Sequence, residues 1–324
     1  MNNPEAASLN TLNMENGRFI RPTSTFRHWV TPDGAPGPSG EGGFPAQAGR
    51  YHLYVSAACP WAHRTLIFRK LKGLEDMISI SAVGSFVESR GWCFTPEPGV
   101  IPDTVNGADY LSEVYLLADP GYSGRFTVPV LWDKQRHTIV NNESSEIIRM
   151  FNSAFDGVGA RAGDYYPARL REAIDAYNDD IYTNINNGVY RAGFATSQAA
   201  YEEAANKLFA ALDRLETHLA RHRYLVGEVL TEADWRLFTT LVRFDSVYHG
   251  HFKCNRRRLV DYPNLWAYTR ELYQVPGVAD TVNLPFIKKH YYADQRMVNP
   301  HGIVPVGPEL DFTTPHGREG VGPR

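Results

Sequence analysis

The chain has 324 residues, 43% hydrophobic and 21% charged, a composition typical of a globular protein rather than a disordered or collagen-like chain. Lys and Arg total 33 against 36 Asp and Glu, so the net charge of −3 lacks the basic excess of a nucleic-acid binder. No apolar run approaches the ~18 residues of a membrane span, and the polar N-terminus does not resemble a secretory signal. With three cysteines and no disulfide framework, we expect a cytoplasmic protein of two domains that contains a free thiol and binds neither nucleic acid nor membrane.

The first 50 residues are punctuated by glycine, proline and serine, most densely between residues 31 and 43. We interpret residues 1–50 as an N-terminal extension, and the stretch 31–43 within it as a loop or extended arm with little capacity for a hydrophobic core. The first domain is therefore expected to begin near residue 51.

Residues 51–155 predict a strand–helix–strand unit, a long insert, and then two strands and a helix. The first strand is rich in aromatic and β-branched residues, and Pro60 suits the first turn of the helix that follows, with Gly73 as its C-terminal cap. The order βαβ, insert, ββα indicates a mixed sheet with a parallel pair. The expected strands are 51–55, 77–83, 126–132 and 138–140, and the expected helices are 60–71, 109–117 and 143–155.

From about residue 170 the hydrophobic pattern changes to a helical period. Apolar residues recur three and four positions apart over 170–185 and again over 201–215. A Thr-x-x-Asp cap opens a third helix at Thr231, and a fourth is expected over 263–273 with Pro263 in its first turn. We therefore predict an all-helical second domain over 156–290 and an irregular tail over 291–324.

Cys59 is the main candidate for chemistry. It lies at a strand-to-helix junction, where free backbone N–H groups and the positive end of the helix dipole stabilise a thiolate, and His63 and Arg64 lie close by in sequence. The alternative is a small cysteine that merely packs. A two-cysteine oxidoreductase would need a second thiol at position 62, which is alanine here. Any mixed disulfide of Cys59 must therefore be resolved by an external thiol.

Three further motifs have both a functional and a structural interpretation. Pro129, at the start of a strand, indicates either a cis turn that offers the Val128 backbone to an extended peptide or an ordinary edge proline. Glu143 and Ser144 open a helix and could hold the zwitterionic end of a γ-glutamyl group, or simply cap that helix. Tyrosines commonly pack, but three of them are candidates for lining an aromatic substrate pocket: Tyr190, Tyr291 and Tyr292.

Taken together, the motifs resemble the glutathione transferase superfamily, and within it the glutathionyl-hydroquinone reductases or Xi class. The resemblance covers nearly the whole chain. Two of its stretches recur across cysteine-type glutathione transferases, and the stretch from Gly188 and the tail are specific to the reductase class. The motifs are residues 56–64, 128–133, 142–149, 188–195 and 299–308.

The resemblance implies a thioredoxin-like domain followed by an all-helical one, with extensions at both ends. It implies a homodimer that reduces glutathionyl-hydroquinones, or related aromatic thioethers, with glutathione as co-substrate and no metal or prosthetic group. Cys59 would be the catalytic thiolate, with Tyr190 and Tyr292 as catalytic residues. Glutathione would be bound by Glu143 and Ser144 at its γ-glutamyl end and by Trp92, Arg125, Val128 and a cis Pro129. The substrate pocket would be lined by Tyr190, Tyr291 and Tyr292.

One stretch departs from the family pattern. Members commonly have Ser-His between the Tyr-Tyr pair and the Asn-Pro, where this chain has Ala293, Asp294 and Gln295, so its substrate preference can differ. Alternative functions are a general cysteine-type transferase or thiol reductase and a β-aryl ether cleaving relative, which share Cys59. A conjugating enzyme of the Tyr or Ser type would not need that thiol, and a non-enzymatic glutathione-binding scaffold would not need to retain it.

Overall fold

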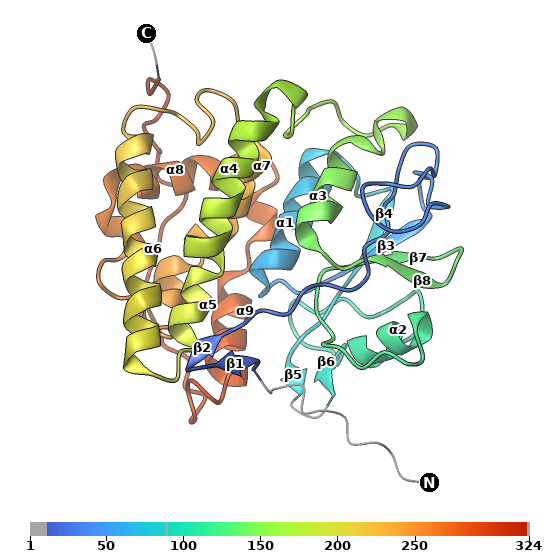
Figure 1. The fold of residues 1–324 in the computed structure, drawn as a ribbon, viewed down its shortest axis with the longest axis horizontal. Coiled ribbons are helices and arrows are strands. Elements are labelled where there is room, and N and C mark those ends of the chain that lie inside the picture. The colour runs from blue at the N-terminus through green and yellow to red at the C-terminus, as the bar shows by residue number, and fades with distance from the viewer. Residues whose placement is uncertain (1–11, 88–89, 323–324) are drawn as a thin grey trace. The chain divides into compact units, whose positions relative to one another are not determined.

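The fold is described from a computed structural model that defines residues 12–87 and 90–322. The described residues divide into two compact units (Figure 1). The first contains Pro22–Gly163, and the second contains Asn13–Arg21 together with the chain from Asp164 onward.

The first unit is built on a four-stranded sheet of order β4–β3–β7–β8. The central strand β3 (Tyr51–Val55) pairs parallel with β4 (Ile78–Ala82) and antiparallel with β7 (Val130–Asp133), which pairs antiparallel with β8 (Thr138–Asn141). All five residues of β3 are buried, as expected for a strand covered on both faces. The mixed sheet with one parallel pair agrees with the predicted pattern. β7 starts later than expected, directly after Pro129, which has no N–H to donate to the ladder.

Two helices of the first unit, α1 (Pro60–Leu71) and α3 (Ser144–Ser153), pack against each other beside this sheet (Figure 1). α1 ends as predicted, with Gly73 just beyond the cap in the left-handed region at φ +62°. The insert contains α2 (Leu111–Ala118), which contacts β6 and β8. It also contains a short antiparallel pair that the sequence did not predict: β5 (Phe86–Val87) and β6 (Gly91–Trp92).

The N-terminal arm, defined here as residues 22–50, is packed more closely than the sequence suggested. Its backbone pairs with the edge of β8, through His28 N–H to the Val140 carbonyl and an antiparallel bridge between Arg27 and Asn141. No residue of the stretch 31–43 is buried, as expected for a loop with little core capacity, but Val30 (2% exposed) and Phe44 (1% exposed), on either side of it, are buried. Glycines and prolines remove the periodicity by which buried residues are recognised, but they do not prevent single apolar side chains from burying.

Within the described residues, the regular elements of the second unit are helices and one short hairpin in its N-terminal segment. Its core is formed where α6 packs on α5 and α8, and where α4 packs on α7. Long helices with an apolar stripe account for the predicted periodicity. Its α-helices are α4 (Arg171–Ile181), α5 (Gly188–Gly193), α6 (Gln198–Leu219), α7 (Glu232–Leu241), α8 (Pro263–Tyr273) and α9 (Leu284–Lys289), and its hairpin is β1 (Met14–Glu15) with β2 (Arg18–Phe19).

The helix expected over 170–185 is interrupted in the structure. α4 ends at Ile181 and continues as a π-helical turn, Tyr182–Asn186, before α5 begins. Ile181 and Ile185 are both buried, so the apolar stripe continues through the wider turn. The apolar spacing in the sequence therefore does not distinguish the π-helical turn from regular α-helix. Two more π-helical turns and four 3₁₀ turns were not predicted: Phe244–Tyr248, His290–Asp294, Asp156–Val158, Ala168–Leu170, Leu259–Asp261 and Ala279–Thr281.

The tail after residue 294 contains no helix or strand as far as residue 322, where its description ends, yet it is anchored. Phe312 is 4% exposed and stacks on Tyr273. The guanidinium of Arg318 is buried, pairs with Glu271, and donates to the carbonyls of Leu219, His222 and Arg223 at the end of α6. The tail therefore ties the end of α6 to α8. Within the described residues, no helix is both long and apolar enough to cross a membrane.

We expect Arg318→Ala to lower the free energy of unfolding by about 3–5 kcal/mol, because it leaves the buried carboxylate of Glu271 with one cation fewer and three helix-end carbonyls without their donor. Denaturant unfolding monitored by circular dichroism would measure the change. Arg221→Ala removes an exposed arginine from the same helix end and should change stability by less than about 0.5 kcal/mol. Equal effects of the two substitutions would contradict the anchoring role.

Candidate functional site

The Cys59 thiol occupies the N-cap of α1. Its sulfur accepts a hydrogen bond from the Ala62 N–H at 3.5 Å, the contact that an N-cap side chain makes with the third residue of a helix. The thiol also donates to the carbonyl of Val128, again at 3.5 Å. Cys59 is half-buried, so the sulfur is both held in place and accessible. This is the position in which backbone N–H groups and the helix dipole favour a thiolate.

Arg64, one turn into the same helix, connects α1 to the start of α3. Its guanidinium is buried, lies 4.6 Å from the centre of the Trp61 ring, and donates to the hydroxyl of Ser144 at 3.4 Å. This contact is made where α1 and α3 pack together, so the motif that contains Cys59 and the motif that contains Ser144 meet in one place.

Glu143 is the N-cap of α3, and its carboxylate is surrounded by donors. Oε1 accepts from the backbone N–H and the hydroxyl of Ser145, both at 3.0 Å, and Oε2 accepts from the hydroxyl of Ser24 at 3.0 Å. Burial acts to raise the pKa of Glu143, but these hydrogen bonds and the charge of Arg64 outweigh it, so the pKa lies below its usual value. The carboxylate is therefore negative at neutral pH.

The remaining residues predicted to bind glutathione lie in two places. The peptide bond between Val128 and Pro129 is cis, as expected, and the Val128 carbonyl faces the Cys59 thiol. Trp92 and Arg125 lie on the insert and are half-buried. The ring of Trp92 packs edge-on against Phe86, and the Arg125 carbonyl accepts from the hydroxyl of Tyr122. Hydrogen bonds thus join Cys59 to Val128 and Arg64 to Ser144.

In the second unit, three buried tyrosines share their hydroxyl groups. The hydroxyl of Tyr190 lies 2.5 Å from that of Tyr291, which lies 3.3 Å from that of Tyr248. The guanidinium of Arg21 lies 4.7 Å from the centre of the Tyr190 ring and donates to Asn187. Tyr248 was not predicted from the sequence, because no local pattern reveals a hydroxyl contact made 43 residues further along the chain.

The electrostatics of this cluster keep Tyr291 and Tyr248 protonated. Burial raises the pKa of both groups well above the ordinary value and the nearby Tyr190 raises it further, while the charge of the buried Arg243 acts in the opposite direction. A group of protonated phenols is a source of hydrogen-bond donors for an aromatic hydroxyl or oxyanion.

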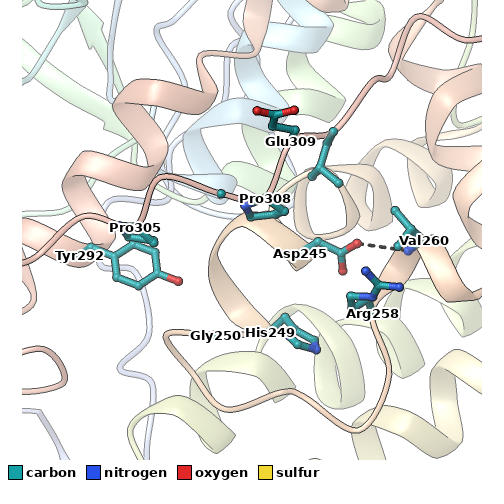
Figure 2. A pocket seen from close by; sticks show the side chains of 11 residues that line it. Asp245, His249, Gly250, Arg258, Val260, Tyr292, Pro305, Pro308 and Glu309 are labelled. Atoms are coloured by element: carbon teal, nitrogen blue, oxygen red, sulfur yellow. Dashed lines mark hydrogen bonds between the residues drawn. The ribbon is translucent and has the colours of Figure 1, made fainter.

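The adjacent Tyr292 points elsewhere. It lines a cavity of about 280 Å³ together with residues of the tail, and its hydroxyl is directed into that space (Figure 2). Its ring lies 4.7 Å from that of His251, centre to centre. The structure thus separates the predicted Tyr-Tyr pair, with Tyr291 in the buried cluster beside Tyr190 and Tyr292 at the cavity. The other lining residues are Asp245, His249, Gly250, Arg258, Val260, Pro305, Gly307, Pro308, Glu309 and Leu310.

The stretch that departs from the family pattern contacts two histidines next to these tyrosines. Asp294 lies 2.9 Å from Nδ1 of His290, and the amide oxygen of Gln295 lies 3.1 Å from Nε2 of His251. Burial lowers the pKa of His251 to about 4, so this ring is neutral at pH 7. The residues that differ from the family pattern therefore supply polar groups beside Tyr292.

The other two cysteines, Cys93 and Cys254, are packed in the interior. Cys93 is 3% exposed, and Cys254 is fully buried, with the pKa of its thiol raised by burial. Among residues 12–87 and 90–322, no group of three or more His, Cys, Asp and Glu side chains is arranged to hold a metal ion.

Comparisons with known proteins find a family match in each unit. Residues 58–154 match the family described as "Glutathione S-transferase, N-terminal domain", and residues 198–271 match "Glutathione S-transferase, C-terminal domain". Glutathionyl-hydroquinone reductase YqjG of Escherichia coli K12 is 59% identical over 304 residues, which are 94% of this chain and 93% of that protein. Glutathionyl-hydroquinone reductase PcpF of Sphingobium chlorophenolicum is 57% identical over 292 residues, 90% of each.

Solved structures agree with the sequence comparisons. The glutathione-bound structure of YqjG superposes with a TM-score of 0.90 at 59% identity, covering 91% of this chain and 96% of that one. The Xi-class glutathione S-transferase of Phanerochaete chrysosporium gives 0.86 at 51% identity, covering 92% and 99%. The predicted fold class, a thioredoxin-like domain followed by an all-helical one, is confirmed.

The position of Cys59 leads to a prediction about its ionisation. We expect the thiol to ionise at a lower pH than an ordinary cysteine, because the N–H groups at the start of α1 and the helix dipole favour the thiolate. Thiolate absorbance near 240 nm, measured against pH for the native protein and for Cys59→Ser, would isolate its titration. A titration at the pH of a free cysteine would mean that the helix start does not activate this thiol.

Proposed function

The chain belongs to the glutathionyl-hydroquinone reductases, the Xi class of the glutathione S-transferases, and on that premise we propose that it reduces glutathionyl-hydroquinones to hydroquinones with glutathione as co-substrate. The observation that carries the proposal is the environment of Cys59, a half-buried thiol at a helix N-cap with alanine three residues later. A helix-start thiol suits attack on sulfur, and the alanine leaves resolution to a second glutathione.

In this proposal, glutathione lies along the contacts that surround Cys59. The negative carboxylate of Glu143 pairs with the ammonium of the γ-glutamyl group, and the hydroxyl of Ser144 and the N–H groups of α3 bind the adjacent carboxylate. The Val128 backbone, before the cis Pro129, pairs with the cysteinyl residue. Trp92 and Arg125 complete the site from the insert, with the guanidinium of Arg125 facing a glutathione carboxylate.

The chemical step exchanges one bond to sulfur for another. The Cys59 thiolate attacks the glutathione sulfur of the thioether, a sulfur–sulfur bond forms, and the bond from sulfur to the aromatic ring breaks. The ring carbon keeps the electron pair and takes up a proton, so the hydroquinone is the reduced product. A second glutathione thiolate attacks the mixed disulfide and leaves as glutathione disulfide, which regenerates the Cys59 thiolate.

The proton for the ring carbon is assigned to the tyrosines. Tyr190 and Tyr292 are the proposed catalytic residues, and Tyr291 completes the pocket. The shared hydroxyls of Tyr190 and Tyr291 and the high pKa of Tyr291 support protonated phenols as donors. As expected for this family, the protein would act as a homodimer in the cytoplasm, without a metal or prosthetic group.

Replacing the thiol tests the proposal directly. We expect Cys59→Ser to abolish turnover of a glutathionyl-hydroquinone, because a hydroxyl cannot form the mixed disulfide, and to leave glutathione binding within a few-fold of the native value. Product formation followed by chromatography, and binding followed by calorimetry, would measure the two effects.

The matched control for this experiment is Cys93→Ser, which changes a packed cysteine whose thiol donates to the Ser85 carbonyl, a bond that a hydroxyl can replace. It should retain turnover. Near-normal turnover by Cys59→Ser would refute the mechanism. Turnover of a chloro-nitrobenzene acceptor in place of the glutathionyl-hydroquinone would identify a conjugating transferase instead.

The proposed roles of the tyrosines are tested by removing single hydroxyl groups. We expect Tyr190→Phe or Tyr292→Phe to lower kcat by roughly 10²-fold, the usual scale of acid–base assistance, with little change in KM. Rapid-quench measurement of the first turnover would confirm that the chemical step is the one that slows.

Tyr201→Phe is the control, because Tyr201 donates to the Lys253 carbonyl away from the cluster and its loss should leave kcat unchanged. A double Tyr190→Phe, Tyr292→Phe variant with full kcat would reduce both side chains to walls of the pocket. In that case, alanine at these positions should raise KM alone.

A further inference from the structure

We infer that Ser24, on the N-terminal arm, is a positioning residue that holds the Glu143 carboxylate for the ammonium group of glutathione. The inference rests on the proposed function, because it takes Glu143 as the residue that binds the γ-glutamyl end. It adds a residue from a segment outside the thioredoxin-like sheet.

The contact itself is specific. The Ser24 hydroxyl lies 3.0 Å from Oε2 of Glu143 and 3.3 Å from the carbonyl of Asn142. A serine hydroxyl has one proton to donate, and a charged acceptor at the shorter distance is the stronger partner. Because Ser145 supplies both donors to Oε1, Ser24 is the side chain that fixes the other oxygen. With both oxygens held, the carboxylate has one orientation instead of several.

The arm is held so that Ser24 stays at this position. Phe26 exchanges two hydrogen bonds with Asn142, its N–H donating to the side-chain oxygen and its carbonyl accepting from the backbone N–H. The ring of Phe26 packs against Tyr115 and Tyr122. Arg27 then pairs with Glu146 on the first turn of α3. These contacts place Ser24 in a fixed register with the residue it contacts, which a loosely attached arm would not do.

The charges around Glu143 make a pH measurement informative. Arg64 from α1 and Arg27 from the arm both act on it electrostatically, and Glu146 from α3 is neutralised in part by Arg27. Removing the Ser24 hydroxyl leaves these charges in place and deletes one donor to the ionised carboxylate. The pKa of Glu143 then rises, and because the ammonium group binds the ionised form, glutathione affinity should be lost at a higher pH on acidification.

The test is calorimetric titration of glutathione into the full-length protein between pH 4 and pH 8. We expect Ser24→Ala to weaken binding by about tenfold at pH 7. It should also move the acidic limb of the binding profile, the pH range over which glutathione affinity falls on acidification, to higher pH. Ser24→Thr keeps the hydroxyl and should restore both the affinity and the pH position of the acidic limb. Ser39→Ala is the control, because Ser39 bonds the Arg27 carbonyl within the same arm without contacting Glu143, so it should leave the limb in place.

The inference is overturned by any of three results: native affinity and an unmoved limb in Ser24→Ala, a loss in Ser24→Thr as large as in Ser24→Ala, or the same loss and shift in Ser39→Ala. Binding of glutathione does not require turnover. The outcome is therefore independent of whether Cys59→Ser abolishes the reductase reaction, and the two proposals can fail separately.

Discussion

A carboxylate that keeps its charge beside the protein core needs donors on every side, and the first unit is arranged to supply them to Glu143. The N–H and hydroxyl of Ser145 donate from the start of α3, the hydroxyl of Ser24 donates from the arm, and the guanidinium of Arg64 in α1 acts through its charge. These groups belong to three different segments, so stabilising one charge requires the two helices to pack together and the arm to follow β8. The same arrangement brings the helix that Cys59 caps against the helix that begins at Ser144.

The second unit is subject to a related constraint, that buried polar groups need hydrogen-bond partners. Here the buried groups are phenol hydroxyls instead of a carboxylate. The hydroxyls of Tyr190, Tyr291 and Tyr248 satisfy one another, which makes burial of three polar groups tolerable. The rings of Tyr190 and Tyr291 pack edge-to-face against Phe252, which adds a favourable electrostatic contribution to the buried area. A buried network of this kind has a fixed geometry, because a displaced hydroxyl would leave another without a partner.

Much of the first unit could be predicted from the sequence, because its signals are local. The aromatic and β-branched residues of strand 51–55, the proline and glycine that bound α1, and the cap at Glu143 are each local features, and the structure contains all of them. Cys59 could be found for the same reason, since its helix-start position and Ala62 are read directly from the sequence. The arm could not be predicted in this way: Val30 and Phe44 are buried by partners distant in sequence, and the glycines and prolines around them leave no period.

The sequence by itself determined the candidate residues for chemistry: one thiol at a helix start, a carboxylate and a serine at another, and tyrosines in a helical domain. Those properties follow from side-chain type and local backbone, which a sequence contains. Tertiary structure alone decided which groups meet, because a hydrogen bond between Ser24 and Glu143, or between Tyr190 and Tyr291, joins residues 119 and 101 positions apart. It also decided that Tyr291 and Tyr292, neighbours in the chain, face different surroundings, because successive side chains on a helical turn project about 100° apart or somewhat less.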